Sequence, residues 1–144
     1  MKTRSFWIAV ILVFVVCAVS EFMIHAVILT NQFYTSLPHL LIQQGETPRQ
    51  YAGLQFASIP LSWLIVAFFF VYIYSRGVEG KGWIGEGVRF GVLIWGVASL
   101  PMFVSMYGWS RLPGRLLMWW IVYSLIQSVL LGLVCAATYR KPAA

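Results

Sequence analysis

Long hydrophobic runs alternate with short polar stretches along the 144-residue chain. Four runs reach the roughly 20 apolar residues that a helix needs to cross a bilayer, and they cover 6–29, 51–74, 88–107 and 116–139. In the hydrocarbon of a bilayer, backbone N–H and C=O groups must form hydrogen bonds within the protein, and runs this long do so as helices. The strands of a β-barrel would instead show alternating apolar and polar residues over about 10 residues. The pattern predicts an all-α polytopic membrane protein. We expect one transmembrane domain over 1–144, a four-helix bundle built as two helical hairpins.

The composition agrees with a membrane location. Hydrophobic residues make up 60% of the chain and charged residues 10%, against about 25% charged residues in soluble domains. The net charge of +6 does not indicate a nucleic-acid partner, because the Lys and Arg residues lie in short clusters between apolar runs and form no basic face. Membrane lipids are therefore the expected surroundings.

The first run has a second interpretation as a signal peptide. Lys2 and Arg4 form a basic start, and residues 18–20 form a passable cleavage site. The apolar character continues past this point to Leu29, which is longer than a signal core requires. We therefore expect a retained span.

The loop charges predict the orientation. One side of the membrane receives seven Lys and Arg residues and the other side three, if the spans alternate in direction. Because cytoplasmic loops carry the excess of Lys and Arg, this count predicts cytoplasmic N- and C-termini in a bacterial inner (plasma) membrane. The seven are Lys2, Arg4, Arg76, Lys81, Arg89, Arg140 and Lys141, and the three are Arg49, Arg111 and Arg115.

The connections and one proline carry local predictions. The outer loop, 30–50, contains a semi-apolar patch at 37–42 that could lie on the membrane surface as a short helix. Thr47 followed by Pro48 is typical of a helix start. Pro101 predicts a kink in the third span.

Ionisable residues are costly inside a membrane, about 2.5–3.5 kcal/mol or more at its centre, and they point to candidate sites. Glu21 and His25 in the first span are spaced i, i+4 and share one helix face. At 1.5 Å per residue they lie roughly 22 and 28 Å from the inner end, in the outer third of the bilayer. The pair could form a functional polar pocket, or His25 could reach the interface and simply solvate Glu21. Both interpretations stay open here.

Polar stripes on the second and fourth spans fall near the same depth. We expect these stripes to face one another in the bundle core, which gives a candidate ligand-binding pocket with Glu21 and His25. Ordinary interhelical hydrogen bonds of about 0.6 kcal/mol each would leave the same pattern. The candidate ligand-binding residues are Glu21, His25, Gln55, Ser58, Tyr123 and Gln127; Tyr51, Ser62 and Trp120 extend the stripes.

The sequence predicts no catalytic residue, no metal site and no cofactor. There is no G-x-S-x-G elbow and no Asp, and the two histidines form no zinc-binding pattern. Cys17 and Cys135 differ by about 10 Å in expected depth, so they are interpreted as small core residues and not as a disulfide. We therefore favour a protein that is not an enzyme.

Small residues on the third span provide a packing motif. Gly87 and Gly91 form a G-x-x-x-G pair that lets another helix approach closely. The partner could belong to the same four-helix unit or to a second copy.

Three short stretches carry a family resemblance: Ile24-His25, residues 87–91 (GVRFG) and residues 112–114 (LPG). On these stretches the chain resembles a group of small bacterial four-helix integral membrane proteins, and the resemblance implies no activity. Small multidrug resistance transporters share an embedded Glu in the first helix, but the 21-residue outer loop does not resemble their tight connections.

Two hypotheses follow for the function. The first is a non-enzymatic protein that binds a lipophilic or cationic small ligand in the outer-leaflet pocket, or serves as an accessory subunit of a larger membrane complex. The alternative is a proton-coupled small-molecule exporter that acts as a dimer, with Glu21 as the proton carrier. In either case the expected partners are lipids and a homo-oligomer or membrane complex.

Overall fold

The computed structural model describes residues 3–34, 49–80 and 82–139, and this part of the chain is helical with no strand. Four helical stretches are long and apolar enough to cross a membrane: Arg4–Tyr34, Ala57–Gly77, Trp83–Trp109 and Gly114–Thr138. The predicted all-α class with four spans is therefore confirmed. The elements are α1 (Thr3–Glu21), the π-helix η1 (Phe22–Tyr34), α2 (Arg49–Gly77), α3 (Trp83–Ile94), the π-helix η3 (Trp95–Ser99), α4 (Leu100–Trp109) and α5 (Gly114–Thr138).

Several boundaries differ from the predicted ones. The first span continues to Tyr34, so residues 30–34 of the predicted outer loop are helical. The third span begins at Trp83, five residues before its predicted start, and therefore includes Glu86. Helix propensity disfavours Gly85 and Gly87 in a helix, but Gly87 packs closely against α5, and this tertiary contact offsets the propensity. The predicted patch at 37–42 and the helix start at Thr47 and Pro48 lie outside the described residues.

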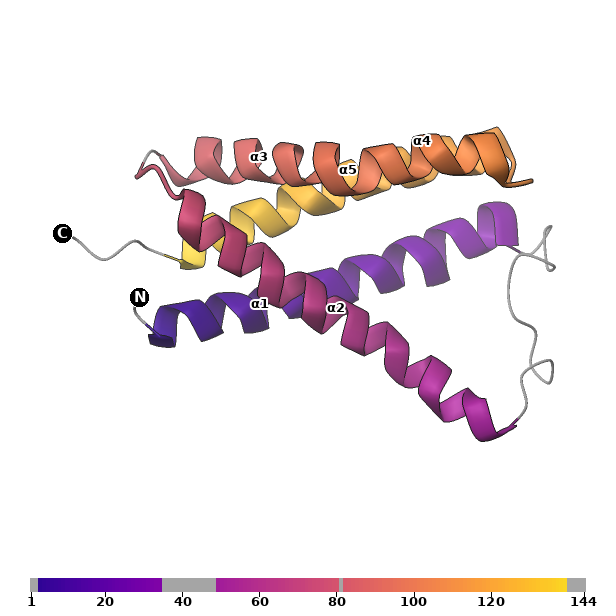
Figure 1. The fold of residues 1–144 in the computed structure, drawn as a ribbon, viewed down its shortest axis with the longest axis horizontal. Helices are drawn as coiled ribbons and strands as arrows, with labels where there is room; N and C mark the ends of the chain where they lie inside the picture. Colours follow the sequence, from indigo (N-terminus) through magenta and orange to yellow (C-terminus); the bar gives the residue numbers. More distant parts are fainter. Residues whose placement is uncertain (1–2, 35–48, 81, 140–144) are drawn as a thin grey trace.

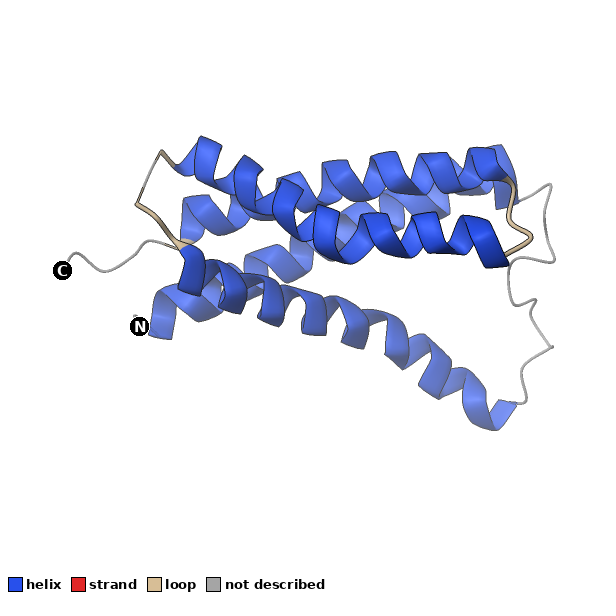
Figure 2. Cartoon of the chain, turned by 45° about the horizontal axis from the view of Figure 1, so that its top comes forward, coloured by secondary structure: helices blue, strands red, loops and turns tan. Residues whose placement is uncertain are grey.

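The two hairpins are arranged differently (Figures 1 and 2). The continuous stretch of α3, η3 and α4 runs antiparallel to α5 along its whole length, whereas α2 crosses α1 and diverges from the bundle toward its own N-terminal end. Residues near both termini meet at one end, where the Ser5 hydroxyl donates to the Thr138 carbonyl at 3.2 Å. This end is called the inner end below, following the predicted orientation.

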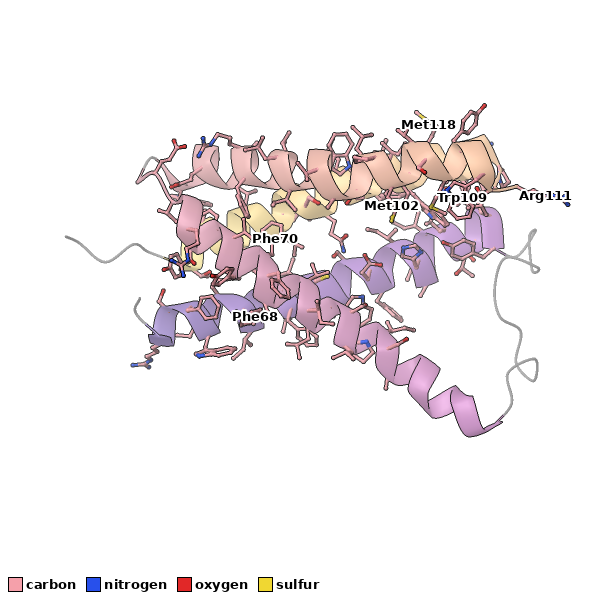
Figure 3. The ribbon with its side chains drawn as sticks, in the orientation of Figure 1. Phe68, Phe70, Met102, Trp109, Arg111 and Met118 are labelled. Carbon is pink, nitrogen blue, oxygen red and sulfur yellow. The ribbon has the colours of Figure 1, made fainter. Side chains whose placement is uncertain are left out.

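The inner half of the molecule holds a hydrophobic cluster from all four spans. Phe68 of α2 packs edge-on against Phe6 of α1, and Phe70 packs edge-on against Phe90 of α3; both α2 rings are visible in Figure 3. Cys17 and Cys135 are free, buried members of this cluster, which agrees with their interpretation as core residues. The buried members are Phe6, Ala9, Val10, Val13, Cys17, Ala67, Phe70, Val71, Tyr74, Leu131, Cys135, Ala136 and Tyr139.

A glycine seam joins α3 to α5. A Cβ atom at Gly87 would lie 2.8 Å from the Gly132 carbonyl oxygen, and one at Gly91 would lie 2.6 Å from the Cα atom of Val129. The G-x-x-x-G motif therefore serves packing within the chain, the first of the two predicted alternatives. Gly132 completes the seam from α5, and its own missing Cβ leaves room for the Gly87 carbonyl.

The outer half holds a second cluster that comes from η1, α5 and the turn before α5. Its buried members are Leu29, Phe33, Tyr34 and Leu116. The described α2 side chains at 57–62 are exposed instead, and the first α2 residue that packs on the inner cluster is Trp63. Around the outer end, the side chains of Trp109, Arg111 and Met118 are exposed, and Figure 3 shows Arg111 projecting away from the bundle.

Pro101 lies two residues after the end of a π-helical turn. Proline has no N–H to offer the carbonyl of Val97, and its ring crowds that carbonyl. The turn before it, Trp95–Ser99, is wound as the π-helix η3. Distortion of the third span is thus found where the sequence predicts a kink.

Candidate functional site

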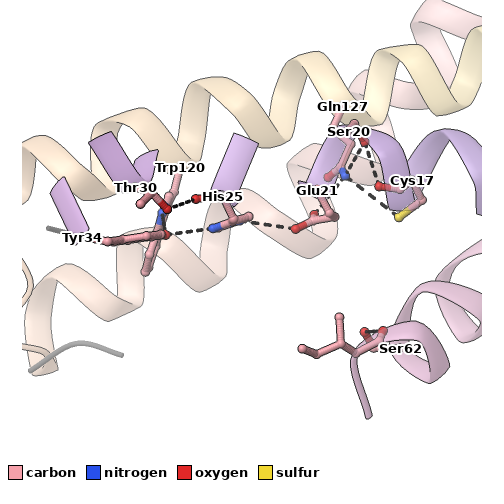
Figure 4. Close-up of polar contacts among 10 residues, drawn as sticks. Cys17, Ser20, Glu21, His25, Thr30, Tyr34, Ser62, Trp120 and Gln127 are labelled. Atoms are coloured by element: carbon pink, nitrogen blue, oxygen red, sulfur yellow. Dashed lines mark hydrogen bonds and ion pairs between the residues drawn. The ribbon is translucent and has the colours of Figure 1, made fainter. Parts of the chain in front are cut away.

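A hydrogen-bonded chain of polar side chains connects the first and fourth spans between the two hydrophobic clusters (Figure 4). The Gln127 amide of α5 donates to Glu21 Oε1 and to the Ser20 hydroxyl, both at 2.9 Å. The other carboxylate oxygen of Glu21 lies 3.3 Å from His25 Nε2, one turn away. Both oxygens of Glu21 therefore have a polar partner, as a carboxyl group at membrane depth requires.

The chain continues outward from His25. The second ring nitrogen, Nδ1, lies 2.8 Å from the Tyr34 hydroxyl, and the Trp120 indole donates to the same hydroxyl at 3.3 Å. The His25 and Tyr34 rings are nearly parallel, with centroids 6.1 Å apart. His25 thus has contacts on both nitrogens, one toward the middle of the bilayer and one toward the outer end.

The π winding of η1 explains this contact. His25 and Tyr34 are nine residues apart, which is two and a half turns of an α-helix and would place them on opposite faces. In the wider π-helix, whose hydrogen bonds span five residues, nine residues make roughly two turns and bring both side chains to one face. The Thr30 hydroxyl donates to the His25 carbonyl, five residues back, at 2.8 Å, which matches this winding.

A cavity of about 190 Å³ adjoins this polar chain. Its lining combines one carboxylate, three side chains with an amide or hydroxyl group and several aromatic rings, and it comes from α1, η1, α4 and α5. A dry protein cavity of about 150 Å³ takes up benzene, so the space suffices for one ring with a small polar group. The lining residues are Glu21, Ile24, His25, Phe103, Trp120, Tyr123, Ser124 and Gln127.

The predicted site residues fall into two groups. Glu21, His25, Tyr123 and Gln127 line the cavity together. Ser58 is exposed on the diverging part of α2 and is not part of this lining, and the side chain of Gln55 lies outside the described residues.

We expected the polar stripe of α2 to contact the polar side chains of the other spans. At Ser58 and Ser62, the stripe residues whose side chains the structure describes, the side chains are exposed instead. The Ser62 hydroxyl donates at 2.7 Å to the Ile59 carbonyl of its own helix. A serine that bonds locally in this way needs no partner across the bundle, so a polar stripe on α2 does not require a polar core.

The sequence interpretation missed Tyr34 and three residues of the cavity lining, Ile24, Phe103 and Ser124. Tyr34 fell within the predicted outer loop, and the helical extension of the first span together with its π winding brings it to His25. Phe103 was not singled out because nothing in an apolar span distinguishes a cavity-lining ring from a lipid-facing one. The i, i+3, i+7 pattern of Trp120, Tyr123 and Gln127 did carry the signal for α5.

The electrostatics of the cavity are dominated by Glu21. Its side chain is 29% accessible, and within the described residues no Lys or Arg forms an ion pair with it. The described part of the chain also contains no group of three or more His, Cys, Asp or Glu residues that could hold a metal ion. The arrangement thus offers one acidic group beside aromatic faces, which suits a positively charged organic molecule.

Comparisons with protein-family models, curated proteins and solved structures found no match to this chain.

Proposed function

We propose that this multi-pass membrane protein binds a small organic cation with an apolar body in the Glu21 cavity. The observation that carries the proposal is a partly accessible carboxylate at the edge of an aromatic-lined cavity, with no Lys or Arg paired to it within the described residues. Carboxylates and aromatic faces together attract ammonium groups, most strongly where water is scarce. The Lys and Arg asymmetry supports a bacterial inner membrane with cytoplasmic termini, so the cavity would serve the outer leaflet.

The cavity also sets the size and shape of the ligand. Phe103 and Trp120 lie with ring centroids 5.9 Å apart, and the Trp120 ring lies 6.3 Å from the His25 ring. These rings surround the apolar part of a ligand, while Glu21 and Gln127 offer polar atoms at one end. A ligand with one aromatic ring and one ammonium group, such as benzyltrimethylammonium, matches both features.

Native mass spectrometry of the mildly solubilised protein tests the proposal without choosing a ligand in advance. We expect a small cationic molecule to co-purify with the wild type and to be lost in Glu21→Gln. Glu79→Gln is the matched control, because Glu79 pairs with Arg89 near the start of α3, away from the cavity. Absence of any small molecule from the wild type, together with stable association with larger partners, would contradict ligand binding and favour an accessory subunit.

A second candidate function, a proton-coupled exporter acting as a dimer, is favoured by one observation. Glu21 contacts α5 through Gln127 and η1 through His25, so its protonation state bears on contacts between two spans. A carboxyl group that binds either a proton or an organic cation, but not both at once, is the simplest way to exchange one for the other. The inner cluster closes the cavity toward the inner end, so export also requires an alternate arrangement of the spans. Cation efflux from proteoliposomes driven by a pH gradient, and lost in Glu21→Gln, distinguishes transport from binding.

A further inference from the structure

We infer that Tyr34 and Trp120 fix the tautomer of His25, so that its imidazole is neutral and carries its proton on Nε2, facing Glu21. The inference rests on the order of donors and acceptors along the hydrogen-bonded chain from Trp120 to Glu21. It deepens the proposed function and depends on it for its biological meaning, because it identifies the groups that leave the charge of Glu21 available to a cation. The tautomer itself is tested without any ligand.

The first step is the direction of the hydrogen bonds. An indole N–H can only donate, so at the 3.3 Å contact Trp120 donates and the Tyr34 oxygen accepts. The indole has no lone pair to accept with, so among the described contacts of the Tyr34 hydroxyl the Nδ1 atom of His25, 2.8 Å away, is the acceptor offered to its proton. An accepting Nδ1 carries a lone pair and no proton, so the single proton of a neutral imidazole lies on Nε2. The Nε2 atom lies 3.3 Å from Glu21 Oε2, so this proton is on the nitrogen next to the carboxylate.

The second step excludes the charged form from this arrangement. An imidazolium donates from both nitrogens, so Tyr34 would accept from His25 and Trp120 at once, and its own proton would lose its acceptor. Tyr34 is only 8% accessible, and a buried donor without a partner is costly. The other titratable groups that face the cavity are Glu21 on α1 and Tyr123 on α5, while α4 contributes Phe103, which does not titrate.

The consequence concerns the net charge of the site. A neutral imidazole donates one hydrogen bond to Glu21 and leaves the carboxylate charge uncompensated. An imidazolium in the same place would form an ion pair and cancel that charge before any ligand arrived. Tyr34 is therefore a positioning residue that acts on the ligand through His25, and Trp120 holds the Tyr34 hydroxyl in the required direction.

Nitrogen-15 NMR of histidine-labelled, ligand-free protein measures the tautomer directly. The substitution His39→Gln leaves His25 as the only labelled histidine of the chain. We expect an unprotonated signal for Nδ1 and a protonated signal for Nε2 in this background. In Tyr34→Phe the Nδ1 atom loses its donor, so the Nδ1-protonated tautomer or the imidazolium should appear. In Trp120→Phe the Tyr34 hydroxyl is free to accept from Nδ1, so the preference should weaken.

Tyr123→Phe is the matched control, because Tyr123 also lines the cavity but donates no hydrogen bond to His25 in the structure. It should leave the His25 signals unchanged. The inference is overturned by a protonated Nδ1 in the His39→Gln background, which needs no folded Tyr34 variant, or by Tyr34→Phe spectra identical to those of the control.

The functional consequence is measured separately, as the affinity for benzyltrimethylammonium. We expect about a tenfold weaker affinity in Tyr34→Phe than in the wild-type protein, corresponding to about 1.4 kcal/mol. Equal affinities would overturn the role of Tyr34 in binding. If the wild type binds no cation while the tautomer is as inferred, the proposed function fails and the hydrogen-bond assignment stands.

Discussion

Glu21 shows how a single carboxylate is held at membrane depth. Its two oxygens have partners on two different spans, Gln127 of α5 and His25 of η1. Hydrogen bonds to a charged group are about twice as strong as those between neutral groups, and their loss leaves the desolvation cost of the group uncompensated. The residue is therefore a structural link between the two hairpins as well as the proposed binding group.

Gln127→Met tests this link. The substitution keeps the size of the side chain and removes the donor to Glu21 and Ser20. We expect the free energy of unfolding to fall by about 1 kcal/mol, the lower end of the cost of a buried polar group that loses its partner, because Glu21 is partly accessible. Unfolding in mixed detergent micelles measures it.

Two further variants complete this test. Ser62→Ala should change the free energy of unfolding by less than about 0.5 kcal/mol, because Ser62 is exposed and bonds only within its own helix. In a Glu21→Gln background the effect of Gln127→Met should shrink, since the charge is absent. An undiminished effect in that background would show that Gln127 acts through packing and not through Glu21.

At the scale of the elements, the packing of α3 on α5 depends on missing side chains. Gly87, Gly91 and Gly132 bring two backbones together at a distance that leaves no room for a Cβ atom. In lipid there is little hydrophobic drive between helices, so close van der Waals packing of this kind supplies much of the association. The seam also fixes the position of α5, which carries Trp120, Tyr123 and Gln127.

Gly91→Ala is expected to destabilise the protein by about 1–3 kcal/mol, because the added methyl group meets the backbone of Ser128 and Val129. Gly85→Ala in the same helix is the control, since nothing lies within 4 Å of its Cβ position. The control should be neutral or slightly stabilising, as alanine has the higher helix propensity. Thermal unfolding of both variants checks the prediction, and equal stabilities would mean that the seam is looser than described.

The elements also show how much of the site could be predicted from the sequence. The four spans and the G-x-x-x-G contact were predicted because length, hydrophobicity and small residues are local signals. Helical spacing also predicted that one site contains Glu21, His25, Tyr123 and Gln127. The contact with Tyr34 could not be predicted, because it requires π winding, which no residue type specifies.

At the scale of the whole molecule, the asymmetry between the two hairpins separates a closed half from an open one. All four spans pack together in the inner half, whereas α2 leaves the bundle in the outer half, where η1 and α5 form the core. The cavity lies between these two clusters. The course of α2 was not predictable, because its polar stripe at 58 and 62 resembles that of a core-facing helix while its side chains are exposed.

The central claim is that the Glu21 carboxylate binds an organic cation in this cavity, and equilibrium binding of radiolabelled benzyltrimethylammonium to the protein in lipid nanodiscs tests it most directly. Neopentylbenzene, its uncharged carbon isostere, is the matched competitor. The wild type and Glu79→Gln should bind the cation with similar affinity, and the isostere should compete poorly. Glu21→Gln should bind at least tenfold more weakly, a loss of about 1.4 kcal/mol or more. Equal binding by Glu21→Gln, or equal competition by the uncharged isostere, would contradict the claim.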